Sequence, residues 1–271
     1  NSSDFSVALP MHDQLSELLD AFEPDIIHSQ HPFLLGMTAL RTARYRQLPL
    51  VFTHHTLYEQ YTHYVPGDSA TMQRFAIELA TRYANLCDQV IAPSQSVAKL
   101  LQQRGVTTPV EVIPTGVYPQ RFAQGDGQAV RQQLGIAADA FVIGHLGRLA
   151  PEKNLEFLAH AVATVAAERT NVHFLVVGEG DLREQYMRDY ADVPNLSFAP
   201  RVPKRMVQDV LTRCDLLYFS VHPSRVWRYG QSLNKVIDYM LAGKPVVASY
   251  TGFPSMINEA GCGSYVPAGD V

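Results

Sequence analysis

Short apolar runs alternate with longer amphipathic segments along the chain. The runs that predict strands are residues 25–30, 48–54, 89–94, 110–115, 141–147, 172–178, 196–199, 216–220, 245–249 and 264–267. Several are apolar at consecutive positions, which is typical of strands buried on both faces of a parallel sheet. Helical periodicity is found between them, in residues 13–22, 71–86, 94–103 and 154–168, and Ser94 is a predicted N-cap. The alternation predicts a doubly wound α/β fold.

A polar, glycine-containing stretch near residues 118–139 divides the chain. We expect two Rossmann-like domains facing a cleft, residues 1–120 and residues 121–271. The first has four predicted strands and lacks a glycine-rich turn after an opening strand, whereas the second has about six. The N-terminal domain is therefore expected to be incomplete. No internal repeat is visible.

Composition places the chain among ordinary globular proteins. It has 271 residues, of which 46% are hydrophobic and 18% charged, and a formal net charge of −4. The acidic balance argues against a nucleic-acid-binding protein, and no apolar run reaches the roughly 20 residues of a membrane span. Three widely spaced cysteines suit a reducing compartment and lack metal-site spacing. No secretory signal is visible at a start that lacks Met, so we expect a cytoplasmic location.

Two glycine-bearing turns follow predicted strands. In GHLGRLAPEKNL, residues 144–155, Gly147 ends a strand and Lys153 begins a helix. A helix N-terminus flanked by Arg148 and Lys153 is suited to binding a diphosphate; the alternative is a loop with two solvated charges. GEGDL, residues 178–182, fits the crevice where open α/β sheets bind ligands, or is a simple strand-to-helix turn.

The histidines of the first half follow two predicted strands. His28 and His31 come after the first, and His54, His55 and His63 after the second. Together they could line one face of the cleft. A metal site is the less favoured alternative, because the spacings match no standard zinc pattern and no carboxylate pair joins them.

Tyrosines recur every three residues beside these histidines, at Tyr58, Tyr61 and Tyr64. Core packing and substrate contact are both open interpretations of this pattern. We expect Tyr58 and Tyr61, with His31 and His63, to lie on the acceptor side of the cleft.

A further candidate site lies in WRYGQSLNKVIDYM, residues 227–240. Asn234, Lys235 and Asp238 fall on adjacent turns of a predicted helix, so a cation and a carboxylate could face one ligand. A carboxylate near a helix start can accept hydrogen bonds from two vicinal hydroxyls, as on ribose. The alternative is a surface Lys–Asp pair of little energetic consequence.

Basic side chains cluster on two predicted helices. Arg41, Arg44 and Arg46 lie on one, and Lys204 and Arg205 on the other. A phosphate-rich membrane surface would attract such clusters, although a solvated face is the favoured interpretation.

The order and spacing of four segments resembles the retaining glycosyltransferases of family 4, which have the GT-B fold. The segments are HTLYEQYTHYVP, IPTGVYPQRF, GRLAPEKNLEFL with VVGEGDL, and AGKPVV preceded by a helix. The resemblance implies a nucleotide-sugar donor held mainly by the C-terminal domain, an acceptor held mainly by the N-terminal domain, retention of the anomeric configuration, and no metal or other cofactor. The resemblance also implies that the nucleotide of the donor is UDP, the usual one in this family. HTLYEQYTHYVP resembles the branch that glucosylates diacylglycerol, whereas YGQSLNKVIDYM resembles a branch acting on lipid-linked amino sugars.

The resemblance also implies catalytic residues. Arg148 and Lys153 match the diphosphate-binding pair, and His55 matches the histidine that lines the donor sugar near the reacting carbon. Gly147 and Gly178, at the ends of two strands, are expected to lie against the donor.

Other donor contacts are implied around the nucleotide. Glu179 and Gly180 match the turn beside it, and Arg201 and Val202 match the segment whose backbone meets the base. Asp238 matches the second acidic residue of a paired-glutamate motif that holds the ribose.

The first acidic residue of that pair is absent. Its position, eight residues before Asp238, is Gly230. We expect Asn234 and Lys235 to take over its role. The resemblance also places an opening strand before Asn1 and a last helix after Val271.

The expected partners are a nucleotide-sugar donor and a lipid or saccharide acceptor. The basic clusters add the inner face of the membrane as an expected peripheral contact, and no nucleic acid is expected.

Three alternative functions stay open. A GT-B sugar-nucleotide epimerase would need acid and base carboxylates in the cleft, which no motif places. A non-catalytic glycosyltransferase-like binding protein and a histidine-metal hydrolase are the others.

Overall fold

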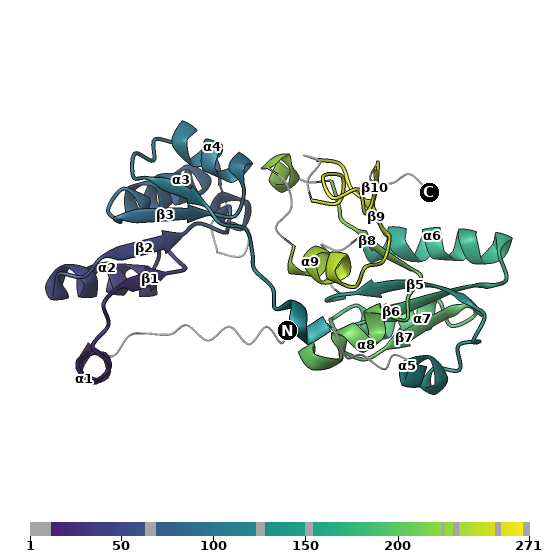
Figure 1. The fold of residues 1–271 in the computed structure, drawn as a ribbon. Coiled ribbons are helices and arrows are strands. Elements are labelled where there is room, and N and C mark those ends of the chain that lie inside the picture. The colour runs from purple at the N-terminus through teal and green to yellow at the C-terminus, as the bar shows by residue number, and fades with distance from the viewer. Residues whose placement is uncertain are drawn as a thin grey trace. The chain divides into compact units, whose positions relative to one another are not determined.

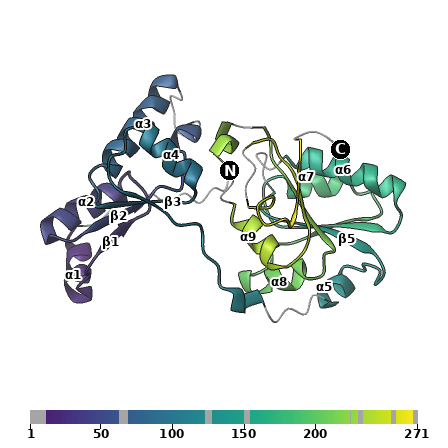
Figure 2. The same ribbon diagram turned by 45° about the horizontal axis from the view of Figure 1, so that its top comes forward.

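The computed structural model describes residues 12–62, 69–122, 128–149, 154–223, 225–229, 233–252 and 256–267. The chain forms two compact units, Asn1–Thr115 and Gly116–Val271, each built on one parallel sheet with helices packed against it (Figures 1 and 2). The predicted α/β class is therefore confirmed.

The first unit has the sheet order β1-β2-β3-β4. Its strands are β1 (Ile27–Ser29), β2 (Leu50–Thr53), β3 (Gln89–Ala92) and β4 (Val110–Val112). Its helices are α1 (His12–Phe22), α2 (Leu35–Arg46), α3 (Ala70–Ala84) and α4 (Gln95–Gln103), with a 3-10 turn η1 (Tyr58–Gln60). Ser94 caps α4, because its Oγ accepts a hydrogen bond from Val97 N at 3.3 Å, which confirms the predicted N-cap.

The second unit has the sheet order β10-β9-β8-β5-β6-β7. Its strands are β5 (Phe141–Leu146), β6 (Val172–Val177), β7 (Leu196–Ala199), β8 (Leu216–Ser220), β9 (Val246–Ser249) and β10 (Gly263–Val266). Its α-helices are α5 (Gln128–Gln133), α6 (Leu155–Glu168), α7 (Arg183–Asp189), α8 (Val207–Leu211) and α9 (Asn234–Leu241). The 3-10 turns are η3 (Pro119–Phe122), η5 (Lys204–Met206) and η6 (Arg225–Tyr229).

The strand order of the second unit reverses beside β5. The chain runs outward from β5 through β6 to β7, and then returns to the other side of β5 to form β8. Open α/β sheets bind ligands outside the carboxyl ends of their strands at such a reversal. The topology therefore places the expected binding edge of this unit at the ends of β5 and β8.

Both faces of this sheet are covered by helices, which explains the continuous apolar runs (Figure 2). Neighbouring residues of β6 alternate between the faces. Phe174 belongs to the core cluster of Val162 on α6, whereas Leu175 belongs to that of Val210 on α8 and Val236 on α9. The strands are therefore buried on both sides, as expected for a parallel sheet.

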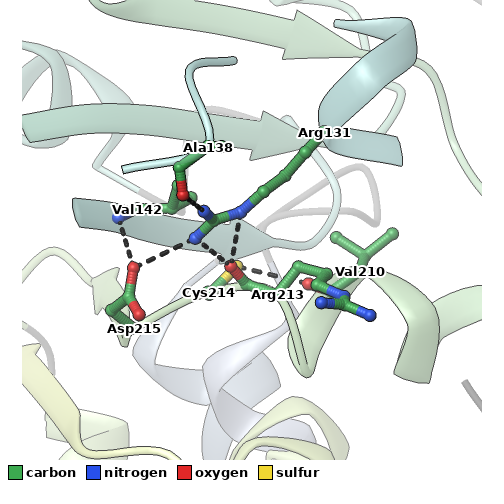
Figure 3. A network of polar contacts seen from close by, with 7 residues as sticks. All are labelled: Arg131, Ala138, Val142, Val210, Arg213, Cys214 and Asp215. Atoms are coloured by element: carbon green, nitrogen blue, oxygen red, sulfur yellow. Dashed lines mark hydrogen bonds and ion pairs between the residues drawn. The ribbon is translucent and has the colours of Figure 1, made fainter. Parts of the chain in front are cut away.

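An aspartate before one strand holds the start of a neighbouring strand in each unit. Asp88 Oδ2 accepts a hydrogen bond from Leu50 N at 2.8 Å, and Asp215 Oδ2 accepts one from Val142 N at 2.8 Å. In the second unit the Arg131 guanidinium also lies 3.1 Å from Asp215 Oδ2 and donates to two backbone carbonyls (Figure 3). This network ties α5 to the amino ends of β5 and β8.

Each of these aspartates follows a buried cysteine. The Sγ of Cys87 donates to Tyr83 O at 3.3 Å, and the Sγ of Cys214 donates to Val210 O at 3.4 Å, four residues earlier in both cases. Burial raises the pKa of both thiols to about 12, so they remain protonated. The Cys-Asp pair is thus a short structural repeat between the units, although no repeat was predicted from the sequence.

Candidate functional site

The glycine-bearing turns after β5 and β6 pack directly on each other. Gly147 N donates to Val177 O at 3.1 Å, and Leu149 N donates to Glu179 O at 2.9 Å. Both sets of residues follow the carboxyl ends of parallel strands, so they lie at the edge where the strand order reverses. The structure therefore brings together two segments that are some thirty residues apart in sequence.

Glycine is required at two of these positions because backbone atoms occupy the place of a side chain. A β-carbon on Gly178 would lie 1.9 Å from Gly147 O, and one on Gly180 would lie 2.1 Å from Leu149 O. Neither distance is sterically allowed. The turns can approach each other only because these two residues have no side chain.

Glu179 links this pair of turns to the end of β7. Its Oε1 accepts a hydrogen bond from Arg201 N at 3.3 Å and lies 3.9 Å from Arg183 Nε. Arg201 is exposed, and Val202 is half-buried against the core. The predicted base-binding segment therefore lies beside the turn of Glu179.

Lys235, in the first turn of α9, extends to Gly147. Its Nζ is buried and lies 3.0 Å from the point where a β-carbon on Gly147 would stand, and 5.6 Å from the centroid of the Phe219 ring. His145 Nε2 lies 3.5 Å from the same point. A cation is thus present at the end of β5, where the sequence predicted an anion-binding site, although it comes from a distant helix.

Asp238 is held by a partner that sequence reasoning missed. Lys204 Nζ lies 2.6 Å from Asp238 Oδ2, with the Lys204 side chain 64% exposed and the Asp238 side chain 14% exposed. The interpretation of Asp238 as half of a surface pair with Lys235 is therefore wrong, because Lys235 points to Gly147. Asn234 is exposed at the start of the same helix.

Tyr239 fixes the strand end that precedes Gly147. Its hydroxyl accepts a hydrogen bond from Leu146 N at 2.7 Å and donates one to Leu146 O at 3.1 Å. Burial raises the pKa of Tyr239, so the hydroxyl remains protonated. The signal that could have identified it is a tyrosine on the apolar face of a helix, since a buried hydroxyl needs a partner.

The start of α6 lies at the same edge of the sheet. Asn154, which precedes α6 in a left-handed conformation with φ of 49°, accepts a hydrogen bond through its carbonyl oxygen from Ser220 Oγ at 2.9 Å. Ser220 ends β8, so the positive end of the α6 dipole faces the strand reversal. Arg148 is exposed after β5. The expected residues Lys153, His63 and Gly230 lie outside the described residues.

The histidines of the first unit do not form one cleft wall. His54 is buried, with 2% of its surface exposed, and burial lowers its pKa to about 4. The expectation that it lines a cleft is wrong, because His54 directly follows β2 and continues the alternation that buries Leu50 and Phe52. His55 is exposed after β2, with Nδ1 3.1 Å from Thr56 Oγ1.

The aromatic residues near His54 pack mainly on one another. The Tyr58 ring lies edge-on to the rings of His31, Phe33 and His54, with centroids 5.1 to 5.5 Å apart. Tyr58 is buried, whereas His31 and Tyr61 are exposed. Of the four acceptor-side residues, Tyr58 therefore lies in the core, at the start of the 3-10 turn η1.

Neither metal ligands nor a membrane span are found among the residues that the structure describes. No three or more His, Cys, Asp or Glu side chains there are arranged to hold a metal ion. No helix within the same ranges has the length and apolar character to cross a bilayer. In the basic cluster of α2, Arg46 pairs with Asp20 at 2.6 Å and Arg44 donates to Leu86 O at 3.0 Å.

Family models match both units. A model of Glycosyltransferase Family 4 matches residues 1–121, and a model of Glycosyl transferases group 1 matches residues 140–271. An alpha-monoglucosyldiacylglycerol synthase of Streptococcus pneumoniae is 33% identical over 178 residues, which are 62% of this chain and 40% of that protein. A GDP-mannose-dependent alpha-mannosyltransferase of Corynebacterium glutamicum is 26% identical over 96% of this chain and 58% of its own length. The chain therefore spans about half the length of these relatives.

Solved structures have the same fold. Anabaena HepE, solved with UDP and glucose, superposes with a TM-score of 0.67 at 22% identity, covering 98% of this chain and 71% of that one. Sucrose-phosphate synthase from Thermosynechococcus elongatus gives a TM-score of 0.68 at 20% identity, covering 94% and 64%. Each of the two family models matches somewhat less than half of the chain, one in each unit. The first unit therefore matches Glycosyltransferase Family 4, the second matches Glycosyl transferases group 1, and the chain has the fold of these glycosyltransferase structures, the GT-B fold.

Proposed function

We propose that the protein to which this chain belongs transfers a sugar from a UDP-sugar to a lipid, lipid-linked or saccharide acceptor, with retention of the anomeric configuration. The observation that carries the proposal is the buried ammonium of Lys235 beside Gly147, at the edge where the strand order reverses. Glycine backbone and a fixed cation are suited to an anionic ligand. The second unit is therefore the donor-binding unit.

The chemical step breaks the bond between the anomeric carbon and the diphosphate oxygen and forms a bond to the acceptor hydroxyl oxygen. The acceptor proton passes to the departing diphosphate. Arg148 and Lys153 stabilise the negative charge that develops there, together with Lys235, so no metal is needed. His55, exposed after β2, is assigned to the donor sugar by the family resemblance. Holding the acceptor hydroxyl close supplies the remaining acceleration.

The choice of UDP and of a lipid acceptor is supported by the relatives. HepE was solved with UDP and glucose, and the Streptococcus relative is named for glucosylated diacylglycerol. The Corynebacterium relative is instead named for GDP-mannose, so GDP is the competing nucleotide. A lipid acceptor would bring the protein to a membrane surface as a peripheral protein.

The direct test is a transfer assay with UDP-glucose, UDP-N-acetylglucosamine and GDP-mannose, each with vesicles containing diacylglycerol. The expected result is a lipid-bound sugar from a UDP donor, with the α-linkage seen by NMR. A β-linked product would contradict retention, and a product from GDP-mannose alone would contradict UDP.

One sequence observation favours a second candidate, a binding protein without catalysis. Gly230 stands where the family has the first acidic residue of its pair. Nucleotide binding without transfer or donor hydrolysis would favour this second candidate.

A further inference from the structure

Glu179, in the turn after β6, is hydrogen-bonded to the segments that follow both neighbouring strands. Its backbone oxygen accepts a hydrogen bond from Leu149 N, 2.9 Å away in the turn after β5. Its side-chain Oε1 accepts one from Arg201 N, 3.3 Å away in the segment after β7. One residue therefore joins the turn in which the diphosphate is expected to bind to the segment that is expected to meet the base.

The two bonds depend on the Glu179 side chain to different degrees. The bond from Leu149 N goes to a backbone oxygen, and Gly178 N likewise donates to Ala199 O at 3.1 Å. Backbone bonds of this kind hold the turn between β5 and β7 whatever side chain stands at position 179. The bond from Arg201 N needs the carboxylate, because Arg201 is exposed beyond the end of β7. The carboxylate therefore restrains a stretch of backbone that has left the sheet.

Arg183, the first residue of α7, lies on the same carboxylate oxygen. Its Nε is 3.9 Å from Glu179 Oε1, with the Arg183 side chain 21% exposed and the Glu179 side chain 52% exposed. At that distance the contact is electrostatic rather than a hydrogen bond, and a half-exposed ion pair adds little to stability. Because both contacts are made by Oε1, the guanidinium favours the carboxylate orientation that faces Arg201 N.

We propose that Glu179 is a positioning residue for base recognition, whose side chain fixes the backbone at Arg201 relative to the diphosphate turn. The proposal rests on the proposed function, which places a UDP-sugar in this unit. A few backbone groups held in place orient a ligand, and a segment that is already ordered costs less to immobilise on binding. The part of the ligand that depends on the Glu179 side chain is therefore the base, not the diphosphate.

Two variants test this role by calorimetric titration of the whole chain. Glu179→Ala loses the acceptor of Arg201 N, whereas Glu179→Gln keeps an oxygen at the same reach. UDP binding is expected to weaken about fivefold in Glu179→Ala, as for one lost hydrogen bond, and less than about twofold in Glu179→Gln. Inorganic pyrophosphate, which has no base, should bind all three chains equally.

Glu184→Ala removes an exposed carboxylate of α7 and is the matched control, with unchanged affinity for both ligands. Equal losses of UDP and pyrophosphate affinity in Glu179→Ala would show that the residue acts on the diphosphate turn, and would overturn the proposal. Unchanged UDP affinity in that variant would overturn it as well.

The second readout needs no nucleotide, so it separates this proposal from the proposed function. In NMR exchange measurements on the unliganded chain, the Arg201 amide should exchange about fivefold faster in Glu179→Ala, as for one lost hydrogen bond, but not in Glu179→Gln. Because Gln also removes the charge, this difference reports on the bond itself. The Leu149 amide should be unchanged in both variants.

An Arg201 amide that exchanges equally fast in the wild type and in Glu179→Ala would overturn the positioning role. If neither UDP nor GDP binds the wild type, the proposed donor fails, and the exchange of the Arg201 amide alone decides on Glu179.

Discussion

The ammonium of Lys235 and the α-carbon of Gly147 lie so close that a single methyl group on Gly147 would stand 3.0 Å from Nζ. Gly147→Ala is therefore expected to displace the ammonium and to weaken UDP binding about tenfold, the equivalent of about 1.4 kcal/mol. Because the displaced atom ends a flexible side chain, the free energy of unfolding should change by less than about 1 kcal/mol. Calorimetric titration and urea unfolding of the same sample measure both quantities.

Two alanine variants serve as controls for this prediction. Gly178→Ala would place its β-carbon 1.9 Å from the backbone oxygen of Gly147, so it should lower the free energy of unfolding by about 1–3 kcal/mol. Gly116→Ala meets nothing within 4 Å and should change neither quantity. Unchanged UDP affinity in Gly147→Ala would show that the Lys235 ammonium does not contribute to binding.

Asp215 is expected to be a stability residue far from the binding edge. Asp215→Ala leaves the Val142 N–H and the Arg131 guanidinium without their shared acceptor (Figure 3). The expected loss in the free energy of unfolding of the second unit is about 1–3 kcal/mol. It can be followed by fluorescence of Trp227, the single tryptophan of the chain. The exposed Asp139→Ala is the matched control, and equal unfolding curves for the two variants would contradict the prediction.

The stability of the first unit is expected to fall in mild acid because of His54. Burial, and then the charge of Arg104, lower the pKa of His54 to about 4 from 6.5. Between these values the unfolded chain binds a proton that the folded unit does not, so the free energy of unfolding decreases as the pH falls from about 6.5 to about 4. His54→Phe should remove this part of the pH dependence, which amounts to at most about 3 kcal/mol in the free energy of unfolding.

Hydrogen exchange of the Phe52 and Val90 amides reports on this unit, because both residues lie in its core. The exposed histidine variant His28→Phe should keep the wild-type dependence on pH. A His54→Phe variant that loses as much protection in acid as the wild type would show that other groups cause the loss.

Asp238 is expected to recognise the ribose hydroxyls of the donor. Asp238→Ala should weaken UDP binding about tenfold but weaken 2′-deoxy-UDP binding less, because the deoxy nucleotide has already lost the contact of its 2′-hydroxyl with Asp238. Lys204→Ala, which removes only the exposed partner at 2.6 Å, should preserve the preference for UDP over its deoxy form. Equal losses for both nucleotides in Asp238→Ala would exclude a ribose contact.

The sequence predicted the strand ends of the second unit because glycine marks them. Gly147, Gly178 and Gly180 follow apolar runs, and the same local signal that predicted a turn also predicts a close backbone approach. His145 and Tyr239 could not be identified in this way. Each is recognised by a partner on another element, Tyr218 and Leu146, and such pairings depend on strand order, which a single sequence does not specify.

The contrast between His54 and His55 has a different cause. Adjacent residues of a strand point to opposite faces. Every second residue from Leu50 onward is buried, namely Leu50, Phe52 and His54, whereas His55 is exposed. This signal was present in the sequence, but treating the histidines as one group concealed it. The pair between Lys204 and Asp238 was not predictable, since it joins η5 to α9.

The central claim is that the second unit binds a nucleoside diphosphate at the ends of β5 and β6. The most direct measurement is calorimetric titration with UDP, GDP and ADP of the wild type, of the double variant Arg148→Ala with Lys153→Ala, and of Arg169→Ala as an exposed control. We predict that the wild type and the control bind UDP and that the double variant does not. Absence of binding for all three nucleotides, or equal UDP affinity in the double variant, would contradict the account.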